Sequence, residues 1–396
     1  MPGISVAQIY GALSGKTWSY ANQEHKNKQE TDCRLTQLLN TTSSLEETIV
    51  KKHLKTIMLV SAAGMLPTIA AAQSFEIGNG WNADLGLLIQ AFGESVDVDG
   101  ADSQFRVKSG FDPSKLTLGL TAPEVDGLTV SGTYQVIQTL NDSGGDPNAT
   151  SVRIAELAVS GDFGTFKAGR GWQIMGSSSL IHDTGSLPGV GGQCGFDRSG
   201  ANGACGRIGY GYVWTDFAPG LQYASKSFGG VSFRAGVFEG QSKTDPRFEG
   251  EINYNSDMFD LWASTMSESS DSGDIKAFDV GGELRFGDAA LTAAYTSGEG
   301  IGRGLRGLNI GSDTTFYYVE GDYTIDKTTL GVSYGAREEE GEAAQDEATL
   351  VMAFIHHKLT DNVTLVAEFN QEEVEAQDGS TTLDAKSIAL GAQLVF

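Results

Sequence analysis

Short segments that alternate between apolar and polar side chains recur along the chain from Leu85 to its end. In one of them Phe278 and Val280 share one face, while Asp279 and Gly281 take the other. A period of two residues is that of a β-strand, because successive side chains point to opposite faces of the sheet. The sequence therefore predicts an all-β protein built from many short strands.

The links between these segments come in two sizes that alternate along the chain. Seven very short turns, such as GDFG at 161–164 and TDN at 360–362, interleave with eight longer polar links. The longest link runs from Trp172 to Pro219. Fifteen links join sixteen antiparallel strands, with tight turns at one rim and long loops at the other, which is the layout of a transmembrane β-barrel. A secreted β-sandwich that binds a partner has the same alternation and stays open as an alternative.

The charge balance excludes one class of partner. The chain has 27 Lys and Arg against 51 Asp and Glu, a net charge of -24. Nucleic acid is excluded, because its phosphates require a basic surface that this chain lacks. The longest apolar stretch, residues 57–72, is interrupted by Pro67 and is shorter than the roughly 20 residues of a spanning helix.

The same apolar stretch has the layout of a secretory signal. Lys51, Lys52 and Lys55 form a basic start, and the triplet Ala70 to Ala72 ends it as a cleavage site. We therefore expect a signal peptide at 50–72 and the β-barrel at 73–396. Residues 1–49 are expected to be a mis-annotated upstream extension, with translation starting at Val50.

Three stretches resemble the general diffusion porins of Gram-negative outer membranes. They are ELAVSGDFGTFKAGR at 156–170, LPGVGG at 187–192 and LQYASKSFGGVSFRAGVF at 221–238, and the terminal Phe396 is also usual in that family. The resemblance implies a 16-stranded antiparallel barrel in the outer membrane, trimeric and filled with water, whose third loop folds inward. It also implies passive diffusion of small hydrophilic solutes, and a Phe396 that is read by the outer-membrane assembly machinery.

Within the family, basic residues on the barrel wall face acidic residues on the third loop, and the field between them filters solutes by charge. The resemblance places Arg170 in this basic set, because it ends the matching Gly-Arg. Lys115 and Arg207 match less closely. Period-two alternation adds Lys167, since it puts Lys167 rather than Arg170 on the inner face. A solvated charge at the rim is the alternative for each of these cations.

The acidic side departs from the family pattern. Gly189 stands where the family has an acid directly after the proline, and Gln193 stands where a further acid is common. Asp183 and Asp197 are the nearest acidic residues, and we assign them to the acidic side of the constriction.

Two cysteines lie in the same glycine-rich link. In an exported protein Cys194 and Cys205 most simply form a disulfide, because the compartment is oxidising. Zinc is the weaker interpretation, since only His182 is near. No metal site is certain.

Acidic residues concentrate in two of the longer links, 337–347 and 371–384. Such carboxylates suit Ca²⁺ or Mg²⁺ that bridges to lipopolysaccharide phosphates, and no other cofactor is expected. The negative net charge predicts a slight preference for cations in the pore.

Two other functions remain open. A solute-specific channel needs a dedicated surface, for example a sugar-binding one formed by Trp172, Trp214, Tyr210 and Tyr212, and packing within the loop is the alternative for these four. A barrel hydrolase needs a general base, and the part expected to be exported contains only the histidines His182, His356 and His357. No nucleophile-elbow or zinc-protease motif is present, so we predict that the protein is not an enzyme.

Overall fold

The computed structural model describes residues 73–138, 140, 150–193, 204–240, 245–269, 273–302, 312–341, 346–376 and 378–396. The expected upstream extension (1–49) and signal peptide (50–72) lie outside this part of the chain and stay predictions. Among the described residues, no helix is long and apolar enough to cross a membrane.

The described residues form eighteen strand segments and one short helix. The first nine are β1 (Gln73–Gly78), β2 (Trp81–Val98), β3 (Gln104–Lys108), β4 (Ser114–Thr121), β5 (Thr129–Gln138), β6 (Thr150–Gly161), β7 (Gly164–Trp172), β8 (Phe217–Ala224) and β9 (Val231–Glu239). The others are β10 (Pro246–Asn255), β11 (Phe259–Glu268), β12 (Ile275–Phe286), β13 (Ala289–Glu299), β14 (Ser312–Ile325), β15 (Thr328–Gly341), β16 (Asp346–Lys358), β17 (Val363–Ala376) and β18 (Thr381–Val395). The helix is α2 (Ser177–Ile181).

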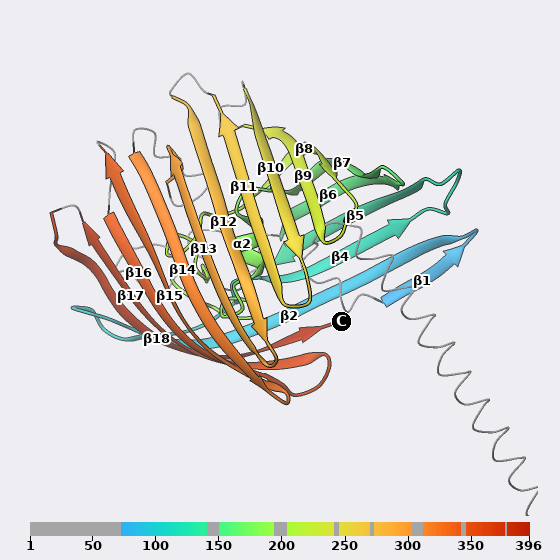
Figure 1. Cartoon of the computed structure of the whole chain (residues 1–396). Helices are drawn as coiled ribbons and strands as arrows, with labels where there is room; N and C mark the ends of the chain where they lie inside the picture. Colours follow the sequence, from blue (N-terminus) through green and yellow to red (C-terminus); the bar gives the residue numbers. More distant parts are fainter. Residues whose placement is uncertain are drawn as a thin grey trace, which may run out of the picture. The chain divides into compact units, whose positions relative to one another are not determined.

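The strands close into a ring in which every neighbour is antiparallel (Figure 1). β18 closes it by pairing with β2, from Ala385 opposite Val98 to Val395 opposite Leu88. β3 and β4 both pair with β2 and form one interrupted strand, while β1 pairs only with the first residues of β2. The barrel therefore has sixteen strands, as the alternating turns and links predict.

The interruption between β3 and β4 brings a ring into the interior. The backbone N–H of Phe111 donates to the carbonyl of Gly189, 2.7 Å away, in the long link after β7. Phe111 lies between the end of β3 and the start of β4, and its side chain is buried. The interruption between β3 and β4 thus places a contact with that link.

Burial along the strands is inverted relative to a soluble protein. In β12, Phe278 and Val280 are exposed, whereas Asp279 between them is fully buried. The same holds in β4, where Leu116 and Leu118 are exposed on either side of the buried Thr117. An apolar outer face around a polar interior matches a barrel in hydrocarbon, and it excludes the β-sandwich alternative, which would bury those apolar side chains.

Aromatic side chains lie on the outer face beside the short turns. Phe163 and Phe166 flank the turn between β6 and β7, and Phe228, Phe286 and Tyr323 lie at three other short turns; all five are exposed. Aromatic rings are favoured at the interface between hydrocarbon and water. These residues are therefore placed where a membrane-spanning barrel needs an aromatic girdle.

Two of the predicted long links are largely strand. β15 continues to Gly341 and β16 begins at Asp346, so most of the acidic link at 337–347 belongs to the wall. The link at 371–384 is likewise taken up by the ends of β17 and β18. Both faces of these strand ends carry many polar residues, so hydrophobic alternation could not reveal them.

Candidate functional site

A long segment between β7 and β8 folds into the barrel, and α2 is seen within the ring of strands (Figure 1). We call it the inward loop (residues 173–216), of which 173–193 and 204–216 are described. Most of its described residues are buried and none is exposed, although it is not a strand of the wall. It is attached by hydrogen bonds from its own N–H and O–H groups to carboxylates of the wall.

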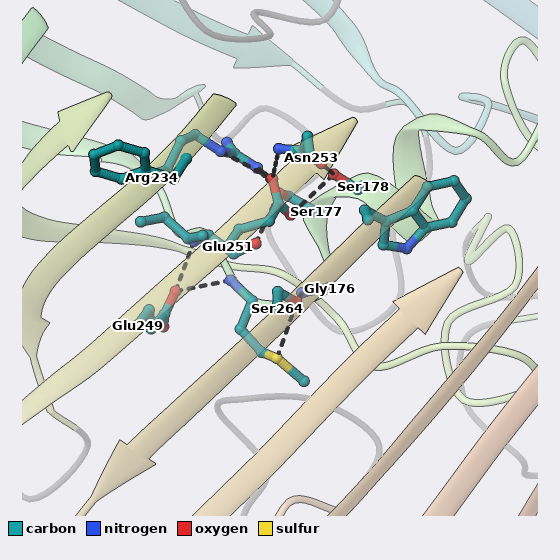
Figure 2. Close-up of polar contacts among 12 residues, drawn as sticks. Gly176, Ser177, Ser178, Arg234, Glu249, Glu251, Asn253 and Ser264 are labelled. Carbon is teal, nitrogen blue, oxygen red and sulfur yellow. Dashed lines mark hydrogen bonds and ion pairs between the residues drawn. The ribbon is translucent and has the colours of Figure 1, made fainter. Parts of the chain in front are cut away.

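The first attachment is to β10, as Figure 2 shows. The backbone N–H groups of Ile174 and Met175 donate to one carboxylate oxygen of Glu249, at 2.6 and 2.9 Å. The next inward-facing residue of β10, Glu251, accepts from the Ser178 hydroxyl at 2.9 Å. Arg234 of β9 joins Glu251 to the start of α2, because it binds the Glu251 carboxylate and also donates to the Ser177 hydroxyl at 2.7 Å. The start of α2 is thereby fixed to the wall.

β12 and β14 provide the next two attachments. Asp279 of β12 accepts from the hydroxyl of Ser179 at 2.7 Å and from the indole of Trp262 at 3.1 Å. Glu320 of β14 accepts from the backbone N–H of Gly185 at 3.2 Å. These carboxylates are almost fully buried, so their charges are satisfied by the loop rather than by open water.

The family-like LPGVGG segment is attached to β17. Glu368 accepts from the backbone N–H of Val190 at 3.0 Å and of Gly191 at 3.2 Å. A Cβ atom on Gly189 would lie 1.8 Å from a carboxylate oxygen of Glu368. It would also lie 2.6 Å from the backbone carbonyl oxygen of Gly185, so a side chain at position 189 requires both the wall carboxylate and the loop backbone to shift.

Gln193 has a similar relation to the wall. Its amide donates to Glu94 of β2 at 2.7 Å, its backbone N–H donates to Glu372 of β17 at 3.0 Å, and its side-chain oxygen accepts from Lys108 at 3.0 Å. Lys108 also binds Glu94 at 2.7 Å. At both positions where the family pattern has an acid and this loop has none, the loop lies against a buried carboxylate of the wall.

A buried ion pair lies inside the loop itself. Arg207 donates to Asp183 at 2.9 Å and to Glu320 at 2.8 Å, and Tyr212 donates its hydroxyl to Asp183 at 2.7 Å. Burial disfavours the charged guanidinium, but Asp183 and Glu320 outweigh this and raise the pKa of Arg207 above its usual value. Burial, together with the negative charge of Asp183, raises the pKa of Tyr212 well above its usual value. These residues hold the loop in shape.

His182 at the end of α2 is also attached to the wall. Its ring stacks on Trp262 with centroids 4.4 Å apart, its Nδ1 lies 2.8 Å from the Ser178 carbonyl, and its Nε2 lies 3.6 Å from Asp260 of β11. Burial lowers the pKa of His182, but the contacts with Asp260 and Ser178 and the charge of Glu283 outweigh it, so the pKa is raised.

The loop leaves a cavity against β4 to β9. Its charged wall residues are Lys115, Arg153, Lys167 and Arg234, with Asp112 and Glu156 as the acids. Its aromatic lining residues are Phe111, Trp172, Trp214 and Phe217, of which Trp214 belongs to the inward loop. Lys115 pairs with Asp112 at 2.6 Å, and Lys167 lies 3.8 Å from Glu156. The cavity is thus lined by both charged and aromatic side chains.

Arg153 reaches this cavity because β6 contains a bulge. Gln135 pairs with Ile154 and Val136 pairs with Val152, so Arg153 has no partner residue in the ladder. An extra residue of this kind re-aims a side chain. The guanidinium carbon of Arg153 lies 5.2 Å from the ring centre of Phe217 and 5.8 Å from that of Trp214. Alternation alone could not have identified this residue.

The cations predicted from the sequence separate into three groups. Lys115 and Lys167 line the cavity. Arg207 lies on the loop and is buried between two carboxylates, so it is not an exposed cation of the wall. Arg170 does not line the cavity: it lies opposite Ala155, on the face of β7 away from Lys167, and its Nε donates to the Val152 carbonyl at 3.2 Å. The constriction role taken from the Gly-Arg motif is therefore not supported for Arg170.

The remaining residues predicted from the sequence differ in where the structure places them. Asp183 is fully buried and bound to Arg207, so it presents no open charge to the cavity. Asp197 and Cys194 lie outside the described residues, so the acid at 197 and the disulfide with Cys205 stay predictions. Phe396 exchanges two backbone hydrogen bonds of 2.8 Å with Leu87 and thereby completes the closing strand pair.

Neither the aromatic surface nor the metal sites emerge as expected. Trp172 and Trp214 line the cavity, but Tyr210 and Tyr212 are fully buried, which removes them from any sugar-binding surface. Within the described ranges, no group of three or more His, Cys, Asp or Glu is arranged to hold a metal ion. Ca²⁺ or Mg²⁺ at the acidic links stays a prediction, because residues 342–345 and 377 are outside those ranges.

A closed sixteen-stranded barrel with an apolar outside and an inward loop defines a channel of the outer membrane. The family model described as Gram-negative porin matches residues 57–377. The chain therefore belongs to the Gram-negative porin family, and it is an outer-membrane diffusion channel. A comparison with curated protein sequences gives no match.

Solved structures share this fold. The anion-selective porin from Comamonas acidovorans is 17% identical with a TM-score of 0.63, over 80% of this chain and 100% of that one. The outer membrane channel DcaP of Acinetobacter baumannii is 15% identical with a TM-score of 0.63, over 81% and 99%. OmpT of Vibrio cholerae, in its trimer form, is 18% identical with a TM-score of 0.53, over 80% and 100%. At these identities the likeness shows the fold alone.

Proposed function

We propose that the protein is a passive pore for small hydrophilic solutes and ions, which cross it through the cavity beside the inward loop. The observation that supports this proposal is that the loop is attached to β2, β10, β12, β14 and β17 and leaves a cavity with charged and aromatic side chains along β4 to β9. No energy source is required, because solutes move down their own gradients.

Liposome swelling tests this proposal. Vesicles that contain the purified protein should swell in isosmotic solutions of small sugars, and the rate should fall as the sugar becomes larger. Swelling no faster than that of protein-free vesicles for every solute would contradict the proposal.

We propose a slight preference for cations, which the net charge of -24 supports. A reversal potential in a KCl gradient that shows firm anion selectivity would contradict this proposal.

We propose that three copies of the chain assemble, which the trimer form of V. cholerae OmpT supports. We also propose a Cys194–Cys205 disulfide, and contacts with lipopolysaccharide through acidic links that bind Ca²⁺ or Mg²⁺. Phe396 is proposed to be read by the assembly machinery, so its deletion should lower the amount of protein in outer membranes without changing the conductance of inserted pores. Equal amounts with and without Phe396 would refute that role.

We propose that the protein catalyses no reaction. The two adjacent histidines of β16 point to opposite faces: His356 is buried, while His357 has its Nδ1 2.9 Å from the Thr328 hydroxyl. His182 is held between Trp262 and Asp260. These positions offer no shared general base and nucleophile.

A further inference from the structure

We propose that the outer face of β14 to β18 binds an anionic phospholipid. Its phosphate lies at Lys327 and Lys358, on the rim with the short turns, and one acyl chain lies in an apolar groove beside them. This inference concerns the outside of the barrel, so it does not depend on the proposed pore. Phosphatidylglycerol is the probe.

The groove crosses the outer face of β14 to β18, because small residues alternate there with large ones. Gly321 lies opposite Val332, which lies opposite Ala353 on its other side. One step nearer the short turns, Ala367 lies opposite Ile355. A Cβ atom on Gly321 would have nothing within 4 Å, so the space beside it is open. Small residues let another chain approach the backbone closely, and packing of this kind is what drives association in hydrocarbon.

The outer face changes from apolar to cationic between the groove and the rim. The backbone N–H of Lys358 donates to the carbonyl of Lys327 at 2.8 Å, so the two lysines end the ladder of β15 and β16. The next pair is Thr328 and His357, whose hydroxyl and Nδ1 lie 2.9 Å apart. Leu330 in the groove is three residues from Lys327, which is about 10 Å along a strand. Cations, polar groups and groove thus follow in the order of the parts of a phospholipid.

The two rim lysines lack a counter-ion in the protein. Like charges directly opposite each other destabilise a strand pair. Among the residues that the structure describes, no carboxylate lies within 4.0 Å of the ammonium group of Lys327 or Lys358, and this includes the acids of the same two turns. At another short turn, by contrast, Lys226 is paired with Asp162 at 2.7 Å. An anion at the rim would relieve the repulsion between the opposed lysines.

The lysines are within reach of the outer face. Alternation directs the Cβ atoms of Lys327 and Lys358 to the pore side, but both side chains are exposed at the rim, where the wall ends. A lysine stem lies along apolar surface while its ammonium group stays in water. The two flexible stems therefore bring their charges to a headgroup beside the outer face.

The position on the barrel indicates a lipid headgroup rather than a free anion. Tyr323, an exposed residue of the aromatic girdle, lies opposite Leu330 of the groove. Lysines beyond the girdle are at the level of the headgroups, where basic residues attract anionic lipids. Since short turns of outer-membrane barrels face the periplasm, the lipid belongs to the periplasmic leaflet. A free phosphate would gain nothing from the groove.

Photochemical labelling of the purified full-length protein in detergent tests the site. A phosphatidylglycerol with a diazirine in its acyl chain is illuminated with the protein, and mass spectrometry of peptides locates the cross-links. We expect them at residues 330–332 and 353–355. The matching phosphatidylcholine, which has no net charge, should label these residues at least about fivefold less, because one lysine contributes about that factor to the binding of an anionic lipid.

Three outcomes of the labelling would overturn the proposal. They are equal labelling by the two lipids, cross-links spread evenly around the barrel, and complete competition by an equal concentration of glycerol phosphate. The last outcome would show that the site takes a free phosphate without a chain.

Variants separate the headgroup contact from the groove. Lys327→Gln combined with Lys358→Gln should lower labelling by phosphatidylglycerol about 25-fold, whereas Lys226→Gln, the same change at another short turn, should leave it unchanged. Ala353→Phe fills the groove and should abolish the cross-links there. Ala263→Phe on the outer face of β11 is its control and should not. Groove labelling that persists in both the double lysine variant and Ala353→Phe would refute the site.

Native mass spectrometry provides a readout without photochemistry and separates this proposal from the pore. Phosphatidylglycerol should stay bound to the native protein and be lost in the double lysine variant. Retained lipid on a protein without KCl conductance would uphold the lipid site and refute the pore. KCl conductance without any retained lipid would uphold the pore and refute the lipid site.

Discussion

The attachment of the inward loop to β17 allows a direct test of how the loop is held. Replacement of Glu368 by alanine removes the acceptor for the backbone N–H groups of Val190 and Gly191. Each buried donor left without a partner costs about 1–3 kcal/mol. The two together lower the free energy of opening this part of the loop by about 2–6 kcal/mol, which raises the opened population about 30-fold or more.

Hydrogen exchange with mass spectrometry measures this opening. Peptides that cover residues 184–193 should lose protection in Glu368→Ala and lose less in Glu368→Gln, which keeps one oxygen acceptor. Glu373→Ala is the matched control, because Glu373 lies on the same strand but is exposed on the other face. Unchanged protection of 184–193 in Glu368→Ala would refute the view that wall carboxylates hold the loop.

Three other predictions concern the same loop. Gly189→Ala should lower the hydrogen-exchange protection of residues 184–193, because the added Cβ would overlap the Glu368 carboxylate. Gly321→Ala is the control and should leave this protection unchanged, because nothing lies within 4 Å of a Cβ at position 321. Equal protection of 184–193 in the two variants would contradict this prediction. Arg207→Gln should destabilise the folded barrel by about 3–5 kcal/mol in thermal unfolding, since it leaves two buried carboxylates uncompensated, and an unaltered melting temperature would count against it. Because the pKa of His182 is raised, its attachment to Asp260 stabilises α2 fully below about pH 6.5, and this stabilisation is lost as the pH rises through the raised pKa. Hydrogen-exchange protection of residues 177–187 should therefore fall over that pH range in the native protein. His182→Gln should show no such fall.

The barrel could be predicted from the sequence because its two signals are local. Alternation fixes which residues face hydrocarbon, as Phe278 and Asp279 show, and very short turns mark one rim. The segment of β16 that is apolar on both faces has a cause that is not local. Leu350 and Met352 are buried inside the barrel in one cluster with Tyr210 of the inward loop.

The site could be predicted only in part because its key features are not local. Lys115 and Lys167 follow alternation and line the cavity. Arg153 depends on a bulge, which has no sequence signal in a single chain. The sequence predicts the acidic side of the constriction on the loop, at Asp183 and Asp197. In the structure, Glu368 and the other wall acids hold the loop from strands far away in sequence. A strand pattern shows that such residues face inward and does not show what they bind.

The conductance of the reconstituted wild-type protein tests the central claim most directly. With KCl on both sides of a planar bilayer, we predict stepwise increases of current that vary linearly with voltage, since a fixed loop leaves a permanently open passage. Absence of conductance from folded, membrane-inserted protein would contradict the claim that the cavity beside the inward loop is a pore.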